Sequence, residues 1–102
     1  MTGFFAVMML AAVAQASPPV LTIHDMAFVP PPGPLVAGET LLVRNDDLFQ
    51  HSATVKGVFD LDLKPGKSGS VVLGRAGTFE VTCRYHPTMK TRLVVQPAPR
   101  KH

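Results

Sequence analysis

Short runs of alternating apolar and polar residues dominate the chain from about residue 20 onward. In the clearest run, Phe79, Val81 and Cys83 fall on one face, and the residues between them fall on the other. A period of two residues indicates a strand with one buried face. Stretches rich in glycine and proline, which favour turns, separate the runs. We predict strands at 20–24, 40–44, 51–56, 58–63, 70–73, 78–83 and 91–96, with 25–29 continuing the first of them past a kink.

The pattern predicts one all-β domain. None of these segments has an amphipathic helical period of useful length, and many short strands separated by turns predict a sandwich or barrel. The proline-rich segment 30–34 is predicted to be a loop at the sheet edge, because proline lacks an N–H and fixes φ. We find no internal repeat, so residues 17–102 are predicted to form a single domain that ends in a short basic tail, Arg100-Lys101-His102.

The first 16 residues follow a different pattern. An apolar run from Phe4 to Ala14 leads into Ala14-Gln15-Ala16, which resembles a signal-peptide cleavage site. The run is too short to span a bilayer as a helix. We predict that residues 1–16 are a signal peptide, that the mature domain is periplasmic, and that it keeps no stable membrane insertion. No Lys or Arg precedes the apolar run, which leaves a misassigned start or an uncleaved anchor as the alternatives.

The charge pattern excludes one class of partner. The 102 residues carry a formal net charge of +3 at pH 7, with both signs interspersed. Basic and aromatic residues do not alternate, which argues against nucleic-acid binding. A mild positive charge is compatible with an acidic docking surface on a partner but does not select one. We expect a monomer with no nucleic-acid partner.

The cysteine content is more informative about function than the charge. Cys83 is the only cysteine, so it cannot form a disulfide within the chain. A free thiol in an oxidising compartment is a liability unless something occupies it. A bound metal ion would occupy it.

Four residues supply soft and borderline metal donors. Cys83, His86 and Met89 form a Cys-x-x-His-x-x-Met loop, and His51 starts a predicted strand on its apolar face. Two histidines and one cysteine in a trigonal plane, with a weak axial methionine, are typical of blue-copper electron-transfer sites. We predict one copper ion, cycling between Cu(II) and Cu(I), at these four residues.

Other chemistries fit the same residues less well. Structural zinc prefers cysteine and histidine and rarely recruits a thioether, so Met89 favours copper. Nucleophilic catalysis by Cys83 with a histidine would leave Met89 unexplained. We interpret His24, His102 and Met26 as structural or surface residues.

The predicted function is single-electron transfer between redox partners, without enzymatic activity. A copper enzyme would need further histidine-rich sites, and the two spare histidines lie far apart in the sequence. The alternative is a periplasmic copper carrier or buffer with no electron traffic, because the same four ligands would serve it.

From about residue 22 to residue 95, the chain resembles the cupredoxins, the small blue-copper proteins. It resembles most the plastocyanin, pseudoazurin and amicyanin branch, and the short ligand loop with its proline after the histidine is most similar to that of amicyanin. The matching landmarks, in the order of the family, are Ile23–Phe28, Gly38–Thr40, Val43–Asp46, His51, Phe59–Asp60, Pro65–Gly66, Gly77–Phe79 and Cys83–Met89.

This resemblance implies a Greek-key β-sandwich with copper at one end. It implies that His51 is the first histidine ligand, Cys83 the thiolate, His86 the second histidine and Met89 the axial ligand. It also implies an apolar patch around His86 where redox partners dock, which Tyr85, Pro87 and Pro34 would border here. One departure lies beside the first histidine, where family members often have asparagine and this chain has Ser52. A hydroxyl can still reach the opposite ligand loop, but the link between the loops is shorter.

Overall fold

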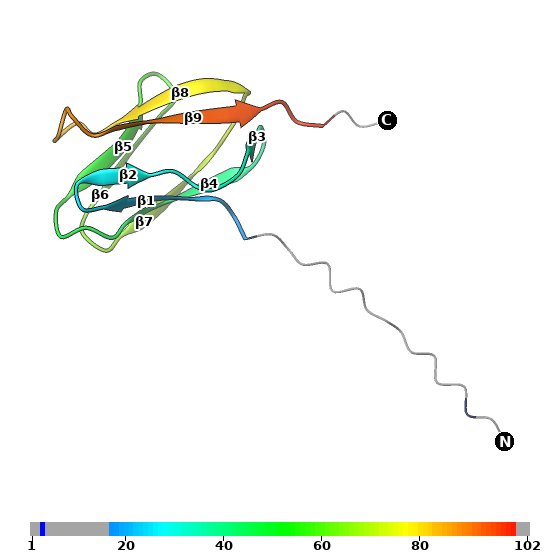
Figure 1. Ribbon diagram of the computed structural model, residues 1–102, viewed down its shortest axis with the longest axis horizontal. Coiled ribbons are helices and arrows are strands. Elements are labelled where there is room, and N and C mark those ends of the chain that lie inside the picture. The colour runs from blue at the N-terminus through cyan, green and yellow to red at the C-terminus, as the bar shows by residue number, and fades with distance from the viewer. Residues whose placement is uncertain (1–2, 4–16, 100–102) are drawn as a thin grey trace.

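The computed structural model describes residue 3 and residues 17–99 of the chain. The predicted signal peptide, apart from Gly3, and the basic tail at 100–102 lie outside the described residues. Within 17–99 the chain forms nine strands and no helix, arranged as two facing sheets (Figure 1). No helix in this part is therefore long and apolar enough to cross a membrane. The strands are β1 (Val20–His24), β2 (Ala27–Val29), β3 (Leu35–Val36), β4 (Thr40–Asn45), β5 (His51–Val55), β6 (Phe59–Leu63), β7 (Ser68–Val72), β8 (Gly77–Thr82) and β9 (Lys90–Gln96).

The two sheets confirm the predicted all-β sandwich. One has the strand order β2-β1-β4-β7 and the other the order β3-β9-β8-β5-β6. The pairs β1/β4 and β3/β9 are parallel, and the other pairs are antiparallel. Several neighbours in a sheet are distant in sequence, so the chain repeatedly crosses from one layer to the other.

The core lies between the sheets and follows the predicted alternation. Fifteen hydrophobic residues form one buried cluster, which includes both Cys83 and Met89. The cluster consists of Leu21, Ile23, Phe28, Leu35, Leu41, Val43, Ala53, Val55, Leu63, Leu73, Val81, Cys83, Met89, Leu93 and Val95. The predicted metal loop is thus part of the core packing.

The prediction that 25–29 continues the first strand is wrong. Asp25 and Met26 have positive φ values of 49° and 60°, and they form a two-residue turn. The chain then reverses into β2, which pairs with β1 in an antiparallel register. Tight hairpin turns of this hand usually contain glycine, asparagine or aspartate, so the sequence Asp-Met gave only half of the usual signal. The two-residue strand β3, beside β9, was also missed because it is too short for a period to be read.

Candidate metal centre

Three of the four predicted ligands meet at one end of the sandwich. The donor atoms of His51, Cys83 and His86 all lie within 4.8 Å of one another. Cys83 Sγ is 3.7 Å from His51 Nδ1 and 3.7 Å from His86 Nδ1. His51 and Cys83 are buried, and His86 is half-buried. Two imidazoles around one sulfur, close enough to share one metal ion, fit a type 1 copper site.

Strand topology explains why these residues meet. His51 is the first residue of β5, and Cys83 directly follows the last residue of β8. Because β5 and β8 are antiparallel neighbours, the start of one lies beside the end of the other. His86 then follows three residues later on the loop between β8 and β9, which turns it back toward the same point.

Met89 is buried at the far end of this loop, immediately before β9. Its backbone N–H donates to the carbonyl oxygen of His86 at 2.9 Å, and the N–H of Cys83 donates to the carbonyl of Met89 at 3.4 Å. These two bonds close the loop into a compact turn. Met89 belongs to the same buried cluster as Cys83. The axial role of its thioether stays a prediction.

Asp47 orients the first histidine, and the sequence reading did not single it out. Its Oδ2 lies 2.7 Å from Nε2 of His51 and also accepts the backbone N–H of Met26 at 3.0 Å. The hydrogen bond with His51, followed by those from Leu48 and Met26, holds the pKa of Asp47 below its usual value. A carboxylate can only accept, so Nε2 carries the hydrogen and the Nδ1 lone pair faces the cluster. The only sign of this contact in the sequence is that Asp47 lies four residues before His51.

Buried Asn45 holds the loop that carries Asp47. Its Nδ2 donates to the carbonyl oxygens of Phe49 at 2.8 Å and Leu63 at 2.9 Å, and its Oδ1 accepts the N–H of Asp47 at 2.9 Å. The side chain is fully buried. Removing it would leave all three groups without this hydrogen-bond partner, and water could not replace the buried bond to Leu63.

The surroundings of Cys83 favour the thiolate. Burial raises the pKa of the thiol, but hydrogen bonds to the sulfur, of which the one from the backbone N–H of Ser52 is the largest, outweigh burial and lower the pKa to about 6. The Ser52 N–H lies 3.4 Å from Sγ. The thiolate, and not the thiol, is the metal ligand.

Ser52 also links the two ligand segments through its side chain. Its Oγ accepts the N–H of Arg84, the residue after Cys83, at 2.8 Å. The expectation that a hydroxyl at this position still reaches the opposite loop is confirmed. Ser52 is fully buried, although the alternation places it on the polar face of β5, because the ligand loop covers it.

Comparison with solved structures identifies the fold. The amicyanin of Paracoccus versutus (Thiobacillus versutus) matches with a TM-score of 0.67 and 24% identity, over 83% of this chain and 87% of that one. A reduced Cu(I) form of an amicyanin mutant matches with a TM-score of 0.62 and 25% identity, over 83% and 88%. The Cu-containing nitrite reductase of Thermus scotoductus matches with a TM-score of 0.71 and 23% identity, over 82% of this chain but only 23% of that one. No protein-family model and no curated protein sequence matches the chain.

The chain has the cupredoxin fold. The predicted resemblance is therefore confirmed at the level of the fold, and the His51–Cys83–His86 cluster occupies one end of that sandwich.

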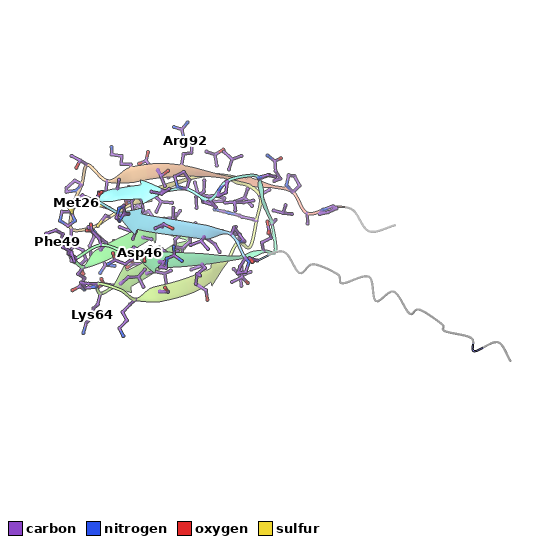
Figure 2. All side chains as sticks on the ribbon, turned by 60° about the horizontal axis from the view of Figure 1, so that its bottom comes forward. Met26, Asp46, Phe49, Lys64 and Arg92 are labelled. Atoms are coloured by element: carbon purple, nitrogen blue, oxygen red, sulfur yellow. The ribbon has the colours of Figure 1, made fainter. Side chains whose placement is uncertain are left out.

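Apolar side chains surround this end of the cupredoxin sandwich. Leu48 and Phe49 are 86% and 57% exposed, and Met26 and Tyr85 are also exposed. Met26 and Phe49 lie at the same end of the molecule (Figure 2). The predicted border residue Pro87 is exposed as well. The prediction that Pro34 borders this patch is wrong, because Pro34 directly precedes β3, which pairs with the end of β9 that lies away from the ligand loop.

Of the two remaining histidines, the structure describes His24, which is not one of the clustered residues. His24 is exposed at the end of β1, where its Nε2 lies 3.4 Å from the carboxylate of Asp25. His102 lies outside the described residues.

Proposed function

We propose that the protein is an exported type 1 blue-copper protein that carries single electrons between redox partners. The observation that carries the proposal is the cluster of His51, Cys83 and His86 within 4.8 Å on a cupredoxin sandwich. Copper would be held by these three residues, with Met89 as the weak axial ligand. Bound copper would supply the one-electron couple between Cu(II) and Cu(I).

The protein's own residues prepare the ligands for that couple. Asp47 fixes the ring of His51, and Ser52 fixes Cys83 and the residue after it. Since both His51 and Cys83 are buried in packed sheets, the ligands have little freedom to move and water is kept from them. Ligands that stay in place in both oxidation states reduce the rearrangement that accompanies electron transfer.

Half-buried His86 would provide the route for the electron. It is the ligand nearest to solvent, and exposed Tyr85 and Phe49 lie at the same end of the molecule. We propose that redox partners dock there and that the protein acts as a monomer without nucleic acid.

We propose that the protein is not an enzyme. The amicyanin matches extend over more than four fifths of both chains, whereas the nitrite reductase match covers 23% of that chain. The likeness to the enzyme is therefore a likeness to one of its parts. We further propose that residues 1–16 are a signal peptide and that residues 17–102 form the periplasmic domain.

The test is a visible absorption spectrum of residues 17–102 after addition of one equivalent of Cu(II), beside a Cys83→Ser variant. We expect an intense blue charge-transfer band that the variant lacks, and reversible reduction without loss of copper. Tight copper binding without the band, or release of copper on reduction, would overturn electron transfer and support the carrier or buffer.

A further inference from the structure

A chain of polar side chains runs along the outer face of β5 and β6 to the ligand loop. Ser52 and Thr54 lie two residues apart on β5, and Asp60 of β6 is the cross-strand partner of Thr54. Ser52 Oγ is 3.0 Å from Thr54 Oγ1, and Thr54 Oγ1 donates to Asp60 Oδ1 at 2.8 Å. At the other end, Arg84 N–H donates to Ser52 Oγ at 2.8 Å.

The direction of the hydrogens in this chain is determined. A hydroxyl has one hydrogen to donate, and an ionised carboxylate can only accept. Because Thr54 donates to Asp60, Ser52 must donate to Thr54, and its oxygen is then free to accept the Arg84 N–H. Hydrogen bonds from Thr54, and secondly from Arg84, hold the pKa of Asp60 below its usual value, which keeps the carboxylate ionised.

Asp60 also contacts the ligand loop directly. It forms an ion pair and hydrogen bond with the guanidinium of Arg84, whose backbone N–H is the first donor of the chain. The Asp60 carboxylate is therefore linked to Arg84 in two ways. It binds the guanidinium directly, and it is connected to the backbone N–H through the hydroxyls of Thr54 and Ser52. The exposed ion pair alone would contribute little, whereas the hydroxyl chain ends on a fully buried serine.

We propose that Thr54 and Asp60 are positioning residues that orient the Ser52 hydroxyl and thereby hold the ligand loop at Arg84. Their role toward a metal rests on the proposed copper function, but their role toward the loop does not. Without the Thr54 hydroxyl, the buried Ser52 hydroxyl loses its acceptor and rotates toward another acceptor. The Arg84 N–H then loses a well-aligned partner one residue from Cys83.

The test is amide hydrogen exchange of Arg84 in the metal-free protein, measured by NMR beside Leu93, whose amide lies in core strand β9. We expect exchange at Arg84 to become about tenfold faster in Thr54→Val, as for the loss of one hydrogen bond. Thr54→Ser keeps the hydroxyl and should restore the wild-type rate. Asp60→Ala should change Arg84 in the same direction, and the matched removal of an exposed acid, Glu80→Ala, should not.

Three results would overturn the proposal: unchanged exchange at Arg84 in Thr54→Val, an equal acceleration at Leu93, or no rescue by Thr54→Ser. If Thr54→Val does not fold, the comparison of Asp60→Ala with Glu80→Ala decides, because both positions are exposed. The Cu(II) spectrum of the wild type is recorded in parallel. Absence of the blue band would refute the proposed function and leave the exchange result to decide the role of Thr54 and Asp60.

Discussion

The two ends of the sandwich are built in different ways. At the end that holds His51 and Cys83, polar side chains such as Asn45 and Ser52 are fully buried, and each is hydrogen-bonded. At the opposite end, the turns after β5 and β7 surround a small apolar hollow with about 20 Å³ of free volume. Its lining consists of Val58, Phe59, Val72, Leu73, Gly74, Arg75, Phe79 and Leu93.

This difference in construction indicates different roles for the two ends. The stabilisation from apolar packing is roughly proportional to the apolar area that is buried, and such packing tolerates exchange between side chains of similar size. Buried polar groups cost stability unless every partner is present, but they fix one geometry. The hollow end therefore contributes stability that many sequences could supply, whereas the metal end contributes a defined arrangement of donors.

The largest expected effect concerns the acidity of Cys83. In the metal-free protein, the thiol pKa of about 6 should appear as an ultraviolet thiolate absorbance with its midpoint near pH 6, which Cys83→Ser lacks. The folded pKa lies below that of an unfolded thiol, so thiolate formation stabilises the fold above pH 6 and this gain is lost as pH falls toward 6. A midpoint above pH 8 would mean that the hydrogen bonds at this end do not outweigh burial.

Loss of Asn45 should be the most destabilising polar substitution at the metal end. Asn45→Ala leaves the carbonyl of buried Leu63 and the N–H of Asp47 without this partner, and we expect about 3 kcal/mol lower unfolding free energy in denaturant melts. Val72→Ala, at a 66% exposed position of the hollow end, should cost less than about 0.5 kcal/mol. Equal losses would erase the contrast between the ends.

Asp47→Asn should weaken metal binding more than folding. An amide can present either its oxygen or its nitrogen to His51 Nε2, so the ring loses its enforced tautomer, and we expect about 10- to 100-fold lower copper affinity in chelator competition. The neighbouring acid provides the control, because Asp46 pairs with Arg44 at 2.9 Å, whereas His51 pairs with Asp47. Similar weakening in Asp46→Asn would indicate a general charge effect.

The sequence predicted the ligands better than their supports. His51 and Cys83 could be placed because strand parity puts both on the apolar face, and their chemistry is unusual at such positions. Asp47 could not, because the second N–H that fixes it comes from Met26, 21 residues away in the turn that the strand pattern concealed. The burial of Ser52 depends on the ligand loop folding over it, which no local pattern records.

Met89→Leu tests the remaining member of the predicted ligand set. We expect the variant to keep copper and to show a higher reduction potential in voltammetry, because a weak donor that helps to stabilise Cu(II) is lost. Leucine is similar in volume, so the core around this buried position should tolerate it. An unchanged or lowered potential would argue against an axial role for the thioether.

Only a small effect is expected from the charged residue that lines the hollow end. The guanidinium of Arg75 lies 5.8 Å from the centre of the Phe79 ring, and both residues line the hollow. Arg75→Gln should lower the unfolding free energy by only about 0.5 to 1 kcal/mol, as for an exposed cation–π contact, and should leave the copper spectrum unchanged. Lys67→Gln removes the same charge without an aromatic partner and should cost less. A spectral change in Arg75→Gln would mean that the two ends are coupled through the sheets, so that the apolar end also helps to set the donor geometry.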